Sequence, residues 1–419
     1  MFKQTIGYAI LVTAAFCQSA TAATLCVDPK NSACFATIGA AVTAAAPGDI
    51  VQVQAGTYPE DVVIAKSLSL IGADAGTTVI NATGKANGIF VNGLASTIPG
   101  VVISGFTVQN ANFEGILLVN ATGATVTGNK VVNNDQGLNI AAGTCPGIPV
   151  FETSEGEDCG EGIHLIGVDN STVARNDVEY NSGGILITDE TGPSFHNLIT
   201  GNLVANNPYD CGITLASHGP APSTGAALSF GVYNNTVSQN TSTNNGYLVP
   251  GAGGGIGIYA PFPGTRNSGN VIVGNQISYN GLPGVVMHNH AGGGPAVNLN
   301  DNMIVGNVIT RNGADTEDAA TPGPTGINIY STVPVTGTVV SQNSINQESV
   351  DFVFNVPTGN VELHLNDFND TAIGVDNLGT GTVNATQNWW NCTAGPNTFG
   401  CGATSGSNVK TAPALTRPF

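Results

Sequence analysis

One short phrase recurs along the middle of the chain, and this repetition constrains the fold more than any other feature. A Gly is followed by an apolar residue, any residue and a second apolar residue, and an Asn-x-apolar phrase comes some residues later. Self-similarity at a fixed short period indicates one supersecondary unit stacked on itself. Copies of the Gly phrase begin at Gly162, Gly184, Gly212, Gly255, Gly284 and Gly326.

The Asn residues set the length of the unit. The shortest gaps between successive Asn phrases are 22 and 23 residues, so one coil is expected to contain three short strands and three corners. Stacked Asn side chains can bond to one another and to corner backbone groups, so we interpret them as scaffold. The aligned positions are Asn129, Asn176, Asn202, Asn235, Asn275, Asn307, Asn343, Asn366 and Asn388.

Composition supports many short strands. Only 9% of the 419 residues are charged and 6% are aromatic, whereas Gly numbers 56. Short Val/Ile/Thr segments separated by Gly and Asn are typical of strands joined by tight corners. One amphipathic helix is expected over residues 34–46, and brief strands follow from Ile50 to Ala73.

The N-terminus and the cysteines predict export. An apolar stretch ending in Ala20-Thr21-Ala22 predicts a signal peptide, and therefore a secreted or periplasmic protein with no membrane insertion after cleavage. Seven cysteines lie outside the predicted signal peptide, and six of them form pairs that are close in sequence, which predicts three disulfides in an oxidising compartment. Cys211 is left over and is interpreted as a buried small apolar residue. The predicted pairs are Cys26 with Cys34, Cys145 with Cys159, and Cys392 with Cys401.

The formal net charge of −18, with ten Lys and Arg in all, argues against nucleic acid as a partner. The same scarcity of cations weighs, less strongly, against polyuronate substrates unless a bound metal supplies positive charge.

Several segments resemble right-handed parallel β-helix repeat proteins of the pectin-lyase-like superfamily. The stretch GDIVQVQAGTYPEDVVIAKSLSLIGA is similar to their N-terminal cap and first coils, and NWWNCTAGPNTFGCG is similar to their end cap. The resemblance implies an all-β, single-stranded right-handed parallel β-helix with an N-terminal capping helix. The predicted division of the chain is therefore the signal peptide over 1–23, the cap and first coils over 24–80, the β-helix over 81–380 and a C-terminal cap over 381–419.

The superfamily includes polysaccharide lyases, glycoside hydrolases, uronate epimerases, adhesins and copper-delivery proteins, so the resemblance does not specify an activity. The sequence matches none of the signature catalytic motifs of pectate lyases, polygalacturonases or alginate epimerases, and no catalytic residue is transferred.

Aligning the repeats brings polar residues to one face, at the positions that follow each Gly phrase. Long loops follow His218, Tyr259 and His290 on that side, which predicts a groove for a polysaccharide. His164, Asp169, Ser217 and Asn289 are predicted to contact the substrate. The predicted catalytic residues are Asp189, Glu190, His218, Tyr259, His288, His290 and Tyr330.

Three chemistries remain open for this face. Hydrolysis by acid and base carboxylates would use Asp189 and Glu190 with His218, and is favoured. A lyase or epimerase would use His288 or His290 with Tyr259 or Tyr330, but no Lys or Arg lies in the aligned positions. The third is a metal site for a divalent cation, calcium or zinc, with ligands His218, His288, His290 and Glu190.

A non-catalytic role as a glycan-binding protein, an adhesin or a metal-handling periplasmic protein also remains open, and the sequence does not assign an oligomeric state. The polar face could also be solvated without a function. An acidic group in the Cys145–Cys159 loop is interpreted as solvated and not as a calcium site. Its members are Glu152, Glu155, Glu157, Asp158 and Glu161.

Overall fold

The computed structural model describes residues 22–139, 142–152, 159–220, 224–248, 253–261, 263–289, 297–316, 321–369 and 372–419. Nearly all of the predicted signal peptide lies outside these residues, as do His290, Glu155, Glu157 and Asp158.

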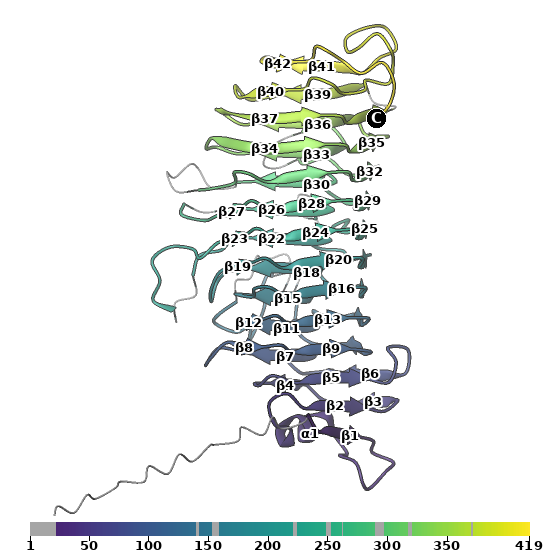
Figure 1. The fold of residues 1–419 in the computed structure, drawn as a ribbon, viewed down its shortest axis with the longest axis vertical. Helices are drawn as coiled ribbons and strands as arrows, with labels where there is room; N and C mark the ends of the chain where they lie inside the picture. The colour runs from purple at the N-terminus through teal and green to yellow at the C-terminus, as the bar shows by residue number, and fades with distance from the viewer. Residues whose placement is uncertain are drawn as a thin grey trace, which may run out of the picture.

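The chain coils into a column in which each turn passes in order through three parallel sheets, A, B and C (Figure 1). In every sheet the strand order follows the chain order, so each strand pairs with its equivalents in the preceding and following turns. This all-parallel stacking confirms the predicted right-handed β-helix.

Sheet A consists of β1 (Thr24–Val27), β2 (Ile50–Val53), β5 (Ser69–Gly72), β9 (Val102–Ser104), β13 (Thr125–Thr127), β16 (Thr172–Ala174), β20 (Leu198–Thr200), β24 (Thr236–Ser238), β28 (Val271–Val273), β31 (Met303–Val305), β34 (Val335–Ser341), β37 (Gly359–His364), β40 (Thr382–Asn384) and β42 (Val409–Lys410). Sheet B consists of β3 (Gly56–Tyr58), β6 (Thr78–Asn81), β10 (Thr107–Gln109), β14 (Lys130–Val132), β17 (Asp177–Glu179), β21 (Leu203–Ala205), β25 (Thr241–Thr243), β29 (Gln276–Ser278), β32 (Val308–Thr310), β35 (Ser344–Asn346) and β38 (Asp367–Asn369).

Sheet C consists of β4 (Val62–Ile64), β7 (Ile89–Asn92), β11 (Ile116–Val119), β15 (Glu161–Ile166), β18 (Gly183–Thr188), β22 (Ile213–Ala216), β26 (Ile256–Tyr259), β30 (Val285–His288), β33 (Thr325–Tyr330), β36 (Val350–Asn355), β39 (Ile373–Asn377) and β41 (Ala403–Gly406). Two small sheets pair β8 (Ile98–Pro99) with β12 (Ala121–Thr122), and β19 (Ser194–Phe195) with β23 (Val232–Tyr233) and β27 (Asn267–Ser268).

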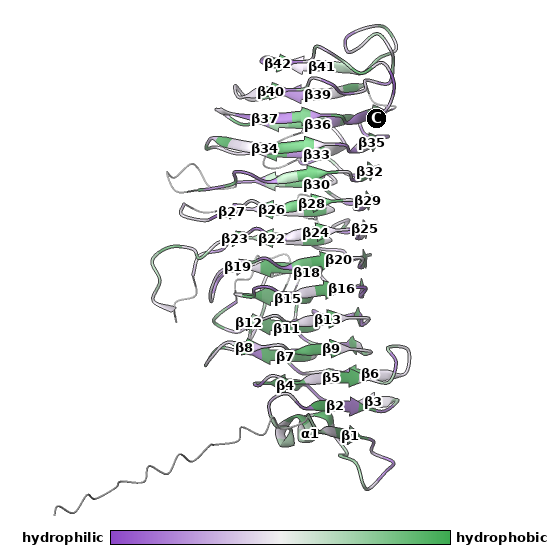
Figure 2. Cartoon of the chain, in the orientation of Figure 1, coloured by the Kyte–Doolittle hydropathy of each residue, from purple (hydrophilic) through white to green (hydrophobic). Residues whose placement is uncertain are grey.

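Alternate residues of each strand point into the column and form one continuous core. In sheet C, Ile187 is in register with Leu215, and both are fully buried. Apolar residues recur in strands along the length of the stack (Figure 2). Because each inward side chain packs on its equivalents one turn away, the repeated apolar pattern is sufficient to build this core.

The Gly of the repeated phrase is required by close backbone approach at the start of the sheet C strands. A Cβ atom on Gly184 would lie 2.1 Å from the carbonyl oxygen of Gly212, and one on Gly255 would lie 2.6 Å from that of Gly284. Any side chain at these positions would push successive turns apart.

Buried Asn residues form three ladders where the sequence predicted one. In the main ladder, Asn202 Nδ2 donates to Asn240 Oδ1 at 2.9 Å and to the Val173 carbonyl oxygen at 3.0 Å. Asn240, and not Asn235 as predicted, therefore belongs to this ladder. Asn235 lies in a second ladder with Asn197, Asn270 and Asn302. A third ladder runs through Asn134, Asn181, Asn207, Asn245, Asn280 and Asn312.

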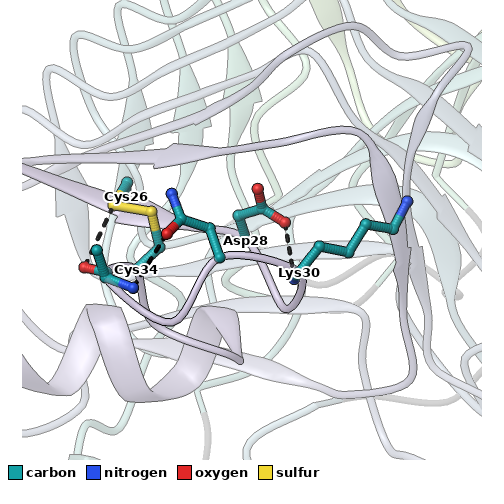
Figure 3. Close-up of a disulfide and its surroundings, with 6 residues drawn as sticks. Cys26, Asp28, Lys30 and Cys34 are labelled. Carbon is teal, nitrogen blue, oxygen red and sulfur yellow. Dashed lines mark hydrogen bonds between the residues drawn. A yellow bond between two sulfur atoms is a disulfide. The ribbon is translucent and has the colours of Figure 1, made fainter.

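The predicted capping helix is present but shorter, as α1 (Ile38–Ala44), and strand β1 precedes it. Thr37 caps its N-terminus, and the Glu60 carboxylate accepts the backbone N–H groups of Ile38 and Gly39. The Cys26–Cys34 disulfide closes the loop before the helix, where Asp28 Oδ1 accepts the Lys30 backbone N–H (Figure 3).

All three predicted disulfides are present, and Cys211 is free and buried, as predicted. In the part of the chain that the structure describes, no helix is long and apolar enough to cross a membrane.

Candidate functional site

The candidate site lies on the outer face of sheet C, over strands β11 to β22. Register places Leu117, His164, Leu186 and Thr214 at equivalent outward positions of successive turns. The segment from 142 to 152 crosses this face, and Phe151 stacks on Phe90 at 6.2 Å between ring centroids. The outward side chains are therefore covered, and polar groups among them are largely removed from water.

Glu114, Glu161 and His164 form the most compact group of titratable residues on this face. His164 Nδ1 lies 2.9 Å from Glu114 Oε1 and 3.7 Å from Glu161 Oε2. The second Glu114 oxygen, Oε2, accepts the Glu161 backbone N–H at 2.7 Å, and His164 Nε2 lies 3.0 Å from Thr188 Oγ1. All three residues are at most 4% exposed.

Glu190 and His218 form a second buried pair close to this group. His218 Nδ1 lies 2.8 Å from Glu190 Oε1, and the two residues are 2% and 1% exposed. Burial alone would raise the pKa of Glu190, but the charges of His218 and His164, together with hydrogen bonds to the carboxylate, outweigh it and hold this pKa below the ordinary glutamate value. Glu190 Oε2 is buried and has no hydrogen-bond partner among the described residues.

Two further carboxyl groups border the cluster. Burial raises the pKa of Glu152 well above its ordinary value, and the charges of Glu114 and Glu190 add to this rise. Burial also raises the pKa of Asp135 to about 8, against hydrogen bonds that lower it. Glu152 comes from the loop closed by the Cys145–Cys159 disulfide, so this disulfide helps to hold a carboxyl group over the face.

Asp189 was predicted to be catalytic, but the structure places it inside the corner after β18. Its carboxylate accepts hydrogen bonds from the His218 backbone N–H at 2.7 Å and the Ser217 hydroxyl at 3.1 Å. The Ser229 hydroxyl and the Gly231 backbone N–H also donate to it. Burial raises its pKa to about 6, although these bonds limit the rise. Asp189 has no exposed surface, and these hydrogen bonds hold the loop after β22 against the corner.

Ser217 and Asn289, predicted to bind substrate, are also fully buried and bond within the protein. The Ser217 hydroxyl accepts the Arg266 backbone N–H at 3.0 Å, and the Asn289 amide donates to the Ala260 carbonyl oxygen at 3.0 Å. Asp169 is half-buried at the sheet corner and accepts the Thr122 hydroxyl at 2.7 Å. Ser217 and Asn289 therefore have no exposed surface, whereas Asp169 is partly exposed at the corner.

Tyr259, His288 and Tyr330 stack on successive turns beyond His218. The His288 ring packs edge to face between the two Tyr rings, at centroid distances of 6.0 and 5.8 Å. Its Nε2 lies 3.0 Å from Asn328 Nδ2 and 3.5 Å from Asp315 Oδ2. Asp315 and Asn328 were not predicted as site residues.

The predicted metal site of Glu190, His218, His288 and His290 lies only partly within the described residues. Glu190 and His218 meet, but strand β30, which carries His288, lies two strand spacings of about 4.8 Å beyond β22. His290 is outside the described residues.

Glu114 and Glu161 were not predicted as site residues, because the aligned polar positions were those that follow each Gly. Each of these residues directly precedes a Gly phrase, at Gly115 and Gly162, and the copy at Gly115 was not aligned. The prediction that Glu152 and Glu161 belong to a solvated acidic loop was wrong. Glu161 is a buried residue of β15, and the Glu152 carboxylate oxygens are buried.

A shallow depression of about 470 Å³ lies elsewhere, at the corner between sheets A and B, and is lined by Lys130, Arg175 and Asp177 among others. It contains no histidine and no arrangement of acid and base groups comparable to the sheet C face. We therefore take the sheet C face as the candidate site.

Comparison with known proteins agrees with this fold. A family model described as the right-handed β-helix region matches residues 86–260, which include the whole cluster from Glu114 to His218. This match and the stacked parallel sheets show that the chain folds as a right-handed parallel β-helix. No curated protein matches its sequence.

Solved structures with a similar fold include the Agl-KA catalytic domain, with a TM-score of 0.55 and 14% identity over 89% of this chain and 64% of that one. Another is ORF18 of Geobacillus virus E2, with a TM-score of 0.54 and 14% identity over 81% and 58% of the two chains. A third is the catalytic unit of a GH87 alpha-1,3-glucanase from Streptomyces thermodiastaticus, with a TM-score of 0.51 and 13% identity over 90% and 65%. This chain spans less than two thirds of each neighbour, and the likeness concerns the fold alone.

Proposed function

We propose that this protein is an exported carbohydrate-active enzyme that hydrolyses a polysaccharide at the outer face of sheet C. The observation that carries the proposal is the pair of Glu190 and His218. One oxygen of a buried carboxylate is held by an imidazole at 2.8 Å, and its other oxygen has no hydrogen-bond partner among the described residues. A carboxylate oriented in this way is suited to act as base or nucleophile in glycosidic cleavage.

Hydrolysis also needs an acid for the leaving oxygen, and Glu152 is the candidate that we assign to this role. It lies near enough to Glu190 for their charges to interact, and it approaches from the loop that crosses the face. A similar fold in an alpha-1,3-glucanase supports a neutral glucan as the first substrate to test.

Lyase chemistry has less support. None of the ten Lys and Arg lies in strands β11, β15, β18 or β22, so no side chain of these strands supplies a cation for a uronate carboxylate. Tyr259, His288 and Tyr330 could supply a base and an acid, and His288 Nε2 lies 3.0 Å from Asn328 Nδ2 and 3.5 Å from Asp315 Oδ2.

The test is release of reducing ends from a glycan panel that contains α-1,3-glucan, other neutral glucans and polyuronates. The variant Glu190→Gln should lose activity by about 10²-fold or more. Glu362→Gln is the matched control, because Glu362 pairs with His364 at 2.7 Å on a distant turn, and it should retain activity. Full activity in Glu190→Gln would refute the catalytic role of Glu190. Unsaturated products would show that the enzyme cleaves by elimination and not by hydrolysis.

A further inference from the structure

Glu114, Glu161 and His164 lie close enough to bind a single metal ion. One ligand atom from each residue falls within 4.8 Å of the other two. In a tetrahedral zinc site with bonds of 2.0–2.1 Å, ligand atoms are separated by about 3.3 Å. The distances of 2.9 and 3.7 Å from His164 Nδ1 to the two carboxylates lie on either side of this value, so small side-chain shifts would admit an ion.

Two of the three ligands are oriented by a second contact. Glu114 is anchored through Oε2 by the Glu161 backbone N–H, which leaves Oε1 facing His164. His164 Nε2 faces the Thr188 hydroxyl at 3.0 Å. If Nε2 carries the proton and donates a hydrogen bond to the Thr188 hydroxyl, then Nδ1 directs its lone pair between the two glutamates, as a metal ligand must.

The surroundings of this triad are buried and rich in carboxyl groups. Glu190, which is 1% exposed, acts electrostatically on His164, and its Oε2 has no hydrogen-bond partner among the described residues. Both carboxylate oxygens of Glu152 are likewise buried without a partner in the described part of the chain, and Glu152 interacts with Glu114 and Glu190. The Lys85 and Lys130 ammonium groups pair with acidic residues elsewhere. Burying several carboxyl groups close together is costly, and a divalent cation would offset their charge.

We propose that Glu114, Glu161 and His164 bind one divalent transition-metal ion, with zinc as the probe. Two carboxylate oxygens with one imidazole nitrogen suit zinc, whereas calcium takes six to eight oxygen ligands. This site differs from the set predicted from sequence, and it is independent of the proposed hydrolysis because it requires no substrate.

The test uses the exported, disulfide-bonded protein with any affinity tag removed. Elemental analysis after dialysis measures bound metal, and calorimetric titration of the metal-stripped protein with ZnCl₂ and CaCl₂ measures affinity. We expect about one zinc per chain and a higher melting temperature with zinc. Glu161→Gln and His164→Gln should abolish stoichiometric binding, and Thr188→Val should weaken it about 10- to 100-fold by releasing the imidazole. Glu362→Gln, the control from the separate Glu362–His364 pair, should bind zinc as the parent does.

Absence of zinc uptake by the parent protein would overturn the proposal, as would parent-like affinity in a folded Glu161→Gln protein. Preference for calcium over zinc would overturn the role of His164. If Glu161→Gln does not fold, as judged by circular dichroism, His164→Gln and Thr188→Val decide the question. A protein that binds zinc but cleaves no glycan would refute the hydrolysis alone, and a zinc-free active enzyme would refute this site alone.

Discussion

Replacing Glu348 by Gln should stabilise the protein at neutral and alkaline pH. Glu348 ends the third Asn ladder, where its carboxylate accepts the Asn312 backbone N–H at 3.0 and 3.1 Å and the Asn312 side-chain amide at 3.0 Å. The residue is 6% exposed, and burial raises its pKa from 4.5 to about 7. The Gln oxygen can accept both hydrogen bonds made to Oε1, so the ladder is kept while the charge is removed.

The sign and size follow from linkage. Below pH 4.5 Glu348 is protonated in both the folded and the unfolded chain, and it causes no loss of stability. As the pH rises from 4.5 to about 7 the unfolded state releases its proton first, so stability falls by about 3 kcal/mol and then stays lower. Glu348→Gln should therefore exceed the parent by up to about 3 kcal/mol at pH 8, and the difference should vanish near pH 4.

Guanidinium unfolding followed by circular dichroism from pH 4 to pH 8 measures this difference. Glu362→Gln provides a control of opposite sign, because hydrogen bonds and the charge from His364 outweigh burial and lower the pKa of Glu362. That carboxylate contributes stability above its unfolded pKa and loses it as the pH falls, so its Gln variant should be the less stable protein at pH 8. A Glu348→Gln protein no more stable than the parent at pH 8, or a difference that persists at pH 4, would refute the reasoning.

Three further substitutions, two of them with a control variant, test the scaffold. Asn275→Ala removes the acceptor for Asn240 and the donor to Asn307, and should lower the free energy of unfolding by about 3 kcal/mol or more. The control Asn346→Ala loses one hydrogen bond from Thr310 and should lower it by about 1 kcal/mol in the same denaturation assay. Gly255→Ala should lower the free energy of unfolding by about 2 kcal/mol or more, because its Cβ would meet the Gly284 carbonyl oxygen. The control is Gly219→Ala, whose Cβ would enter open space. Equal melting temperatures for the two variants would contradict the close approach at Gly255. Asp189→Asn should loosen the loop after β22 and speed its proteolysis; an unchanged cleavage rate would show that the four hydrogen bonds to Asp189 do not hold this loop.

The face of the candidate site was predictable from the sequence only in part. Glu190 and His218 follow equivalent Gly phrases on adjacent turns, so alignment of the repeats brought them together correctly. The same alignment gave Asp189 a catalytic role, because an aligned position does not reveal whether the chain has turned inward at a corner. His288 was grouped with His218 for the same reason, although a whole turn lies between their strands.

The sequence by itself determined the scaffold: the parallel coils, the Gly column, the buried Asn and the three disulfide pairs. It could do so because each coil contacts mainly its neighbours, and a local pattern repeated at a regular offset encodes such contacts. Only the tertiary structure decided the composition of the acidic cluster. Glu114 and Glu161 are 47 residues apart, yet they lie on adjacent turns because the disulfide-closed insertion between them loops out of the column and folds back over it. The length and path of such an insertion follow no repeat, so neither the meeting of Glu114 with His164 nor the burial of Glu152 is encoded in the local pattern.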